Sequence, residues 1–385
     1  MNLLSSKKWQ PYPVYSLADW INGLAFRDIN FSDDRKGVPV IKINELKNGI
    51  GSQTAFTKDS FDKKYFLNKG DMLFSWSGSP ETSIDIYWFD LPEGWLNQHI
   101  FKVLPDANLV DKKFFFYLLK SQKSVFVHRA KQRQTTGLGH VTVSDLKNLI
   151  VSIPESKDDQ RSIAALLGSL DDKIELLRAE NTTLERMAET IFKEWFVDFR
   201  FPGATGVMVD SELGKIPEGW RVGTVMDVIE RLTITYRCDK DDLDSDGKTP
   251  IIDQGTTSIY GYTKRDPDMI ATAEAPVIVF TNHTCNLWLI NYPFCAIQNV
   301  IPFKGKNGYD EFFIYFMTKG QIEFIEYKGH WPDFEIKEYI IPLVEIAKKY
   351  SSVVQPMVYR IWSNNKDISN LSRLRDELLN NIFSH

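Results

Sequence analysis

Residues 158–199 read DDQRSIAALLGSLDDKIELLRAENTTLERMAETIFKEWFVDF, and the spacing of their apolar side chains decides the fold. These side chains recur at alternating steps of four and three residues, at Ile163, Leu167, Leu170, Ile174, Leu177, Leu184, Ala188, Ile191 and Trp195. Asn181 occupies the one polar position of the series. A sustained period of 3.5 residues is typical of a left-handed coiled coil. At 1.5 Å per residue, about 40 residues would form a helix of roughly 60 Å.

The same period returns at the end of the chain, at Val354, Met357, Ile361, Asn364, Ile368, Leu371, Arg375, Leu378 and Ile382. The first helix has a start signal, because Ser156 and Asp159 form a capping-box pattern just after Pro154. Each series contains an asparagine, which lowers the stability of an apolar seam but disfavours slipped registers. We expect the two helices to pack antiparallel on each other. The alternative is that each helix is only the amphipathic edge of its own domain.

Segments on either side of the first helix repeat in the same order. Residues 96–103 (LNQHIFKV) and 113–119 (KFFFYLL) match 296–303 (AIQNVIPF) and 311–317 (EFFIYFM). Gly139-His140 before Ile153-Pro154 likewise matches Gly329-His330 before Ile341-Pro342. Internal repetition of this kind indicates a duplicated architecture. We therefore predict four segments: a globular domain over 1–154, a long helix over 155–200, a second domain over 201–344 and a second long helix over 345–385.

Short apolar runs that end in turn residues, at 72–76 and 277–281, indicate buried strands in both domains. The aromatic segments 114–119 and 312–317 fit helices that pack on a sheet. The predicted fold class is α+β: two mixed α/β domains separated by two long helices in an antiparallel coiled coil, with a pseudo-twofold internal repeat. Two domains on one duplex would suit a two-part DNA site, whose halves lie about 34–36 Å apart or multiples of that distance when they face the same side.

Bulk composition places limits on the class of protein. The 385 residues include 43% hydrophobic and 25% charged residues, which is ordinary for a globular chain. No apolar run is long enough to cross a bilayer, and residues 1–12 lack the apolar core of a signal peptide. The three cysteines, Cys238, Cys285 and Cys295, have neither disulfide nor zinc spacing. We expect a cytoplasmic protein.

The net charge of −5 does not favour nucleic acid, but the charge is unevenly distributed. Residues 1–150 carry 20 basic and 15 acidic side chains, a balance of +5, whereas residues 201–344 carry 13 and 21, a balance of −8. Residues 112–144 contain seven basic side chains and no carboxylate. Such a run is either a solvated face or a nucleic-acid contact, and DNA contacts in the second domain would have to be local.

Several motifs resemble those of type I restriction–modification specificity subunits. They are 140–147 (HVTVSDLK), 160–164 (QRSIA), 170–177 (LDDKIELL) and 194–199 (EWFVDF), which together look like the family's central conserved region, and 213–220 (LGKIPEGW), which looks like the entry to the second recognition domain. The resemblance covers almost the whole chain. The last helix departs from it, because it keeps the spacing and little of the sequence of the first.

The resemblance implies two target-recognition domains, each reading one half of a split sequence in double-stranded DNA. The helices would set the spacing and bind two modification methyltransferase subunits, and restriction (translocase) subunits would join for cleavage. The chain itself would bind no cofactor, since S-adenosylmethionine, ATP and Mg would belong to the partner subunits. It would be a non-catalytic subunit without a metal site. The alternative function is a coiled-coil scaffold that does not read DNA.

The predicted DNA-binding side chains combine cations for phosphates with polar groups for base edges and close backbone approach. They are Ser75, Ser77, Ser79, Lys120, Lys123, Arg129, Lys131, Arg133, Gln134, Thr135 and Thr136 in the first domain, and Thr281, Asn282, His283, Thr284, Lys328 and His330 in the second. Because 328–331 differs from 135–140, the loop contacts implied by the resemblance are firmer for the first domain.

The predicted coiled-coil and partner contacts are Ile163, Leu167, Leu170, Ile174, Leu177, Asn181, Leu184, Ile191, Ile361, Asn364, Ile368, Leu371 and Leu378. A further pair of sites stays open. Asn97 and Gln98, with Gln298 and Asn299, fit either base reading or hydrogen bonding to buried backbone groups, and the sequence favours the structural role.

Three apparent catalytic motifs fail on closer reading. Residues 291–294 (NYPF) differ at the second position from the Asn-Pro-Pro-Phe motif of adenine methyltransferases, and no Gly-rich cofactor loop accompanies them. Residues 332–337 (PDFEIK) crowd a nuclease-like set of acids into six positions. The acidic run 239–247 lacks the terminal glutamate of a calcium loop.

Overall fold

The structure is a computed structural model that describes residues 8–27, 30–134, 137–255, 259–325 and 328–384. The chain divides into two compact units: unit 1 comprises 1–175 and 368–385, and unit 2 comprises 176–367. The long helices α6 (Lys157–Phe192) and α9 (Val344–Phe383) therefore each contribute to both units. The division into four segments stays a prediction. None of the helices in these ranges is long and apolar enough to cross a lipid bilayer.

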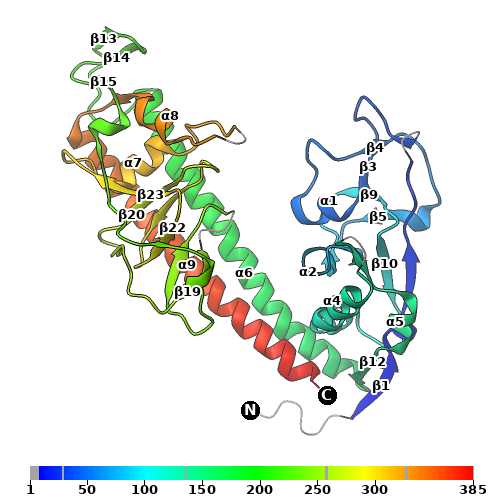
Figure 1. Ribbon diagram of the computed structural model, residues 1–385. Coiled ribbons are helices and arrows are strands. Elements are labelled where there is room, and N and C mark those ends of the chain that lie inside the picture. Colours follow the sequence, from blue (N-terminus) through cyan, green and yellow to red (C-terminus); the bar gives the residue numbers. More distant parts are fainter. Residues whose placement is uncertain (1–7, 28–29, 135–136, 256–258, 326–327, 385) are drawn as a thin grey trace. The chain divides into compact units, whose positions relative to one another are not determined.

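Unit 1 contains two four-stranded sheets, two short strand pairs and five shorter helices (Figure 1). Its strands are β1 (Trp9–Pro13), β2 (Ala18–Asn22), β3 (Val38–Ile41), β4 (Phe56–Thr57), β5 (Phe66–Asn68), β6 (Met72–Ser75), β7 (Ser77–Gly78), β8 (Asp85–Trp88), β9 (Glu93–Leu96), β10 (Ile100–Pro105), β11 (Gly139–His140) and β12 (Ile150–Pro154). Its helices are α1 (Ile43–Asn48), α2 (Pro80–Ser83), α3 (Lys112–Ser121), α4 (Lys123–Gln132) and α5 (Val143–Asn148).

Unit 2 also contains two four-stranded sheets, with two strand pairs beside them. Its strands are β13 (Met208–Ser211), β14 (Gly214–Pro217), β15 (Arg221–Thr224), β16 (Ile229–Arg231), β17 (Arg237–Cys238), β18 (Thr249–Ile252), β19 (Ile259–Thr263), β20 (Val277–Thr281), β21 (Leu287–Ile290), β22 (Cys295–Ile297), β23 (Val300–Gly305) and β24 (Glu338–Ile341). Its shorter helices are α7 (Glu311–Thr318) and α8 (Trp331–Ile336).

The predicted duplication is confirmed by the topology of the main sheets. The strand order is β2-β10-β6-β8 in unit 1 and β16-β23-β20-β21 in unit 2, and every neighbouring pair is antiparallel. In both units a strand near the start of the repeat pairs with a strand near its end, β1 with β12 and β15 with β24. The aromatic helices α3 and α7 follow the equivalent strands β10 and β23. The two units are built on the same plan.

The second sheets share their centre and differ at the edge. In both, a parallel pair forms the middle, β3 with β9 and β18 with β22, and an antiparallel neighbour extends it, β4 and β19. The remaining edge strand is antiparallel in unit 1 (β5) and parallel in unit 2 (β17). The basic helix α4 has no counterpart in the described part of 319–330, which contains no helix. The two units therefore differ at the periphery of the repeat.

Helices α6 and α9 pack antiparallel within each unit, which confirms that prediction. In unit 1, Ile163 and Leu167 near the start of α6 share a core with Leu379 and Ile382 at the end of α9. In unit 2, Ala188 near the end of α6 shares a core with Tyr350 and Val354 near the start of α9. All thirteen predicted seam positions are buried or half-buried.

The two predicted asparagines meet in the seam of unit 2. Asn364, which is fully buried, donates its side-chain N–H to Oδ1 of Asn181 at 2.9 Å, and Asn181 donates to Oδ1 of Asn365 at 2.8 Å. One turn away, Arg360 forms a bidentate ion pair with Glu180. Among the residues that the structure describes, Oδ1 of Asn364 has no hydrogen-bond partner. The polar position therefore costs stability while it favours one pairing of the helices.

Gln160 joins the first turn of α6 to the globular part of unit 1. Its side chain is fully buried, and its Oε1 accepts a hydrogen bond from the backbone N–H of Asp111 at 2.7 Å. Its Nε2 donates to the backbone oxygens of Leu109 at 3.2 Å and Pro154 at 2.8 Å. The Asp111 carboxylate in turn caps α3. In unit 2, Ser351 of α9 donates to the Asp310 carboxylate that caps α7, so in each unit a polar side chain of a long helix contacts the residue that caps the aromatic helix.

Candidate nucleic-acid interface

The five predicted cations of the α3–α4 region are all paired with carboxylates of unit 1. Lys120 and Lys123 contact Asp85, Arg129 and Arg133 contact Asp145, and Lys131 contacts Glu81. Five cations against three carboxylates leave a local charge of +2. These long side chains keep between 25% and 48% exposure, so exposed pairs can exchange partners with a phosphate at modest cost.

Asp145 is the structural centre of the arginine pairs. Its side chain is 7% exposed, forms a capping box with Thr142 at the start of α5, and pairs with Arg133. Arg129 also donates to the backbone oxygen of Asp145 at 3.0 Å. Burial by itself raises the pKa of Asp145, but the hydrogen bonds from Thr142 and Arg133 outweigh burial and hold the pKa below its ordinary value. The two arginines therefore stabilise a helix start in addition to any contact with DNA.

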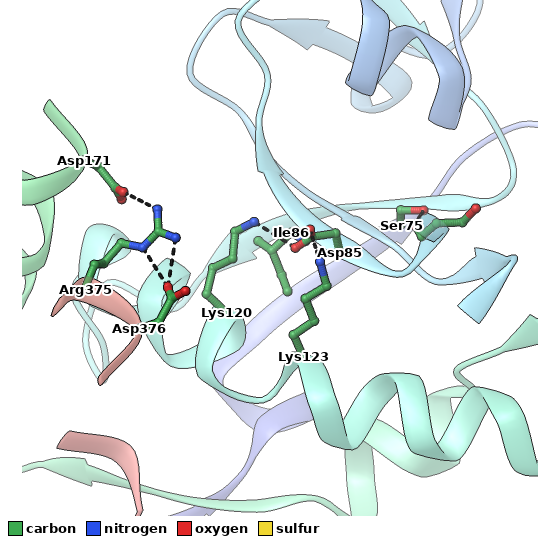
Figure 2. A network of polar contacts seen from close by, with 9 residues as sticks. Ser75, Asp85, Ile86, Lys120, Lys123, Asp171, Arg375 and Asp376 are labelled. Atoms are coloured by element: carbon green, nitrogen blue, oxygen red, sulfur yellow. Dashed lines mark hydrogen bonds and ion pairs between the residues drawn. The ribbon is translucent and has the colours of Figure 1, made fainter. Parts of the chain in front are cut away.

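Lys120 and Lys123 both contact Asp85 (Figure 2). All three residues line a groove of about 690 Å³ in unit 1. Its charged lining comprises the cations Lys120, Lys123 and Arg375 and the acids Glu81, Asp85, Asp171 and Asp376. Three cations against four acids give −1, which does not favour a phosphate backbone. Arg375 of α9 joins the acids by pairing with Asp171 at 2.8 Å and Asp376 at 2.8 Å. Lys131 lies outside this lining, but its ion-pair partner Glu81 belongs to it.

The turn after β6 was predicted to contact DNA through serine hydroxyls, and for Ser75 this is wrong. Ser75 is fully buried, and its hydroxyl donates to the backbone oxygen of Ser83 at 2.6 Å. Ser77 is half-buried in the β7–β11 pair opposite His140, and Ser79 is exposed just before α2. Contact by Ser77 and Ser79 stays a prediction.

The equivalent residues of unit 2 divide in the same way. Thr281 is fully buried and hydrogen-bonded to Thr284 and Asn286. His330 is also fully buried, with its Nε2 at the backbone of Ile325. The prediction that these two side chains contact DNA directly is therefore wrong. Asn282 is half-buried and accepts from the N–H of Trp331 at 2.8 Å.

The remaining predicted residues are exposed or undescribed. His283 and Thr284 are exposed, and both are tied to Gln254: the His283 N–H donates to its Oε1 at 2.9 Å, and the Thr284 hydroxyl donates to its backbone oxygen at 2.9 Å. Lys328 is exposed and pairs with Asp333 at 2.7 Å. Gln134 is exposed and donates to the backbone oxygen of Gly137. Thr135 and Thr136 lie outside the described residues.

The same backbone geometry places a polar turn at one end of the main sheet in both units. In unit 1 the N–H of Trp76 donates to the carbonyl of His99 at 3.2 Å, and the carbonyl of Trp76 accepts from Val141 at 2.8 Å. In unit 2 the N–H of Asn282 donates to Asn299 at 2.9 Å, and its carbonyl accepts from His330 at 2.8 Å. In each unit, three segments therefore meet at one surface: the end of β6 or β20, the turn before β10 or β23, and the loop at Val141 or His330.

The convergence adds residues that sequence reasoning did not select. Asn22 ends β2 and accepts the indole N–H of Trp76 at 3.0 Å, while the His99 ring lies 5.7 Å from the same indole with its plane tilted by 58°. His140 lies opposite Ser77 through the β7–β11 pair. In unit 2, Gln254 occupies the corresponding surface beside His283. The sequence could have indicated these residues only through their positions at the ends of predicted strands. Which strand ends lie together is decided by the pairing of strands that are far apart in the chain.

Within the part of the chain that the structure describes, no group of three or more His, Cys, Asp or Glu side chains is placed to hold a metal ion. The site thus consists of hydrogen-bonding and cationic side chains on two duplicated α/β frames. Such groups can bind phosphates and base edges.

Comparison with known proteins also indicates a protein that recognises DNA. A family described as "Type I restriction modification DNA specificity domain" matches residues 6–186. The MjaIX specificity subunit of a type I restriction enzyme from Methanocaldococcus jannaschii is 25% identical over 307 residues, which are 74% of this chain and 70% of the relative. The HindI specificity subunit from Haemophilus influenzae is 34% identical over 138 residues, which are 35% of this chain and 30% of the relative.

A solved structure agrees with the fold of the whole chain. The type I restriction–modification S subunit from M. genitalium superposes with a TM-score of 0.60 at 18% identity, covering 100% of this chain and 98% of that one. The matched family is one of DNA-recognition domains. The chain is therefore similar to type I restriction–modification specificity subunits, with a family match over residues 6–186 and a shared fold over the whole chain.

Proposed function

We propose that the chain recognises a bipartite site in double-stranded DNA, with one recognition surface in each unit. The observation that carries this proposal is the duplicated turn, in which Trp76 and Asn282 make the same pair of backbone hydrogen bonds in their two units. Duplicated recognition surfaces suit duplicated half-sites. Phosphate contacts would position the protein, and polar side chains at the turns would provide the sequence preference.

The chain would act as a non-catalytic subunit. Its partners would be two modification methyltransferase subunits and, for cleavage, restriction subunits, and these would carry S-adenosylmethionine, ATP and Mg. The paired helices α6 and α9 are the proposed attachment surface for the modification subunits. The cytoplasm, where the DNA lies, is the proposed location.

Methylome sequencing with and without the gene tests this function. Loss of methyladenine at one split motif on deletion is the expected result. An unchanged methylome, with the partner subunits expressed, would contradict sequence recognition and would favour a scaffold.

A matched pair of charge variants tests where the duplex lies. Lys131→Gln removes a cation of the α4 face, whereas Glu81→Gln releases the same cation from its ion pair. We expect weaker binding for the first variant, with the salt slope reduced by about one, and tighter binding for the second. Equal affinities of both variants and wild type in mobility-shift titrations would contradict the placement on α4.

A further inference from the structure

Two glutamines occupy the same position in the two units. Gln98 and His99 form the turn that follows the bridge residue Asn97 and leads from β9 to β10, and Gln298 and Asn299 form the turn between β22 and β23. In each case the preceding strand is the centre of the second sheet, and the following strand lies in the main sheet. The turns are therefore equivalent although they lie 200 positions apart.

The side chains of the two glutamines, unlike that of Asn97, do not satisfy buried backbone groups. Asn97 is buried, and its Oδ1 accepts from the N–H of His99, so it satisfies the backbone as the sequence suggested. Gln298 is exposed, and its side-chain amide makes no hydrogen bond to any described residue. The Gln98 amide is half-buried and contacts only the neighbouring imidazole, at 3.4 Å. Both amides are thus available to a ligand.

Each turn is held rigidly by groups from another segment. In unit 2 the Arg237 guanidinium donates to the carbonyls of Ile297 at 3.0 Å and Val300 at 2.7 Å, which flank the turn. In unit 1 the N–H of Gln98 donates to Leu24 at 2.8 Å, and a Cβ on Gly23 would lie 2.1 Å from the carbonyl oxygen of Asn97. A turn fixed in this way loses little entropy on binding.

We propose that Gln98 and Gln298 are equivalent base-reading residues, each contacting an adenine in the major groove of its own half-site. A glutamine amide offers one acceptor and two donors, which match N6 and N7 of adenine in a bidentate contact. The neighbouring polar groups, His99 and Ser77 in unit 1 and His283 and Gln254 in unit 2, lie on the same surfaces and would contact adjacent bases or phosphates. This inference rests on the proposed function.

Selection from a randomised DNA duplex library tests the inference, using the full chain assembled with its modification subunits. For Gln98→Ala we expect the preference for adenine to fall about five- to 150-fold at one position of one half-site, while the other half-site is unchanged. Gln298→Ala should do the same to the other half-site only. Each variant is thereby the control of the other, and Gln53→Ala, on a different exposed turn, should select the wild-type motif.

A gain of function separates base reading from loss of folding. Gln98→Glu and Gln298→Glu should shift the preferred base at that position from adenine toward cytosine, whose N4 donates to a carboxylate. Wild-type motifs from all four variants, or an equal weakening at every position, would overturn the inference. If wild-type protein itself selects no split sequence, the proposed function fails instead.

Discussion

Gln160→Leu is the sharpest test of how the central helix is attached to the recognition domain. The leucine side chain has a similar size but cannot bond to the backbone groups of Asp111, Leu109 and Pro154. Each lost hydrogen bond costs about 1 kcal/mol, and more where the abandoned backbone group stays buried. Gln160 is fully buried, so water cannot readily replace the amide. We expect the free energy of unfolding to fall by about 3 kcal/mol.

Urea denaturation followed by circular dichroism measures the loss, and hydrogen exchange locates it. Peptides covering 109–119 should exchange faster in the variant, because the start of α3 loses its tie to α6. Gln132→Leu is the matched control: this glutamine is exposed on α4 and bonds only to His128, so its replacement should change stability by less than about 0.5 kcal/mol. Equal stability of Gln160→Leu and the control would refute the reasoning.

Two further predictions concern buried polar groups. Asp145→Asn should destabilise the protein at neutral pH by about 1–2 kcal/mol, because it weakens the hydrogen bonds and the helix cap that the carboxylate makes. Since the pKa of Asp145 is lowered in the folded state, wild type should lose this advantage as the pH falls below about 4. Parallel pH profiles of the two proteins in thermal unfolding would contradict this role of the Asp145 carboxylate. Asn364→Leu should raise the free energy of unfolding by about 1 kcal/mol, because it removes a buried, unpartnered oxygen from an apolar helix seam. A lower melting temperature of the variant would show that the contact between Asn364 and Asn181 stabilises the folded protein instead.

Local patterns in the sequence were sufficient for the helices and the duplication. The 3.5-residue period needs only the order of side chains along one helix, and the seam positions follow from it. Likewise, the repeat appears as matching segments in matching order, and the shared sheet topology confirms it. The start of α6 at Lys157 also follows from a local signal, because Ser156 accepts from the N–H of Asp159 at 3.4 Å.

Tertiary structure decided which polar side chains are available to a ligand. The composition of 112–144 indicates seven cations, but Asp85 lies 35 positions from Lys120 and neutralises it through the folding of β8 against α3. Ser75 was predicted to contact DNA and is buried, while for Gln98 the sequence favoured a structural role, and its amide contacts the neighbouring His99 imidazole instead of buried backbone groups. Burial and ion pairing depend on contacts between residues far apart in the chain, whereas helical periodicity depends on neighbouring residues. For this reason the sequence alone determined the helices and the repeat. It did not determine which side chains are exposed on the recognition surface.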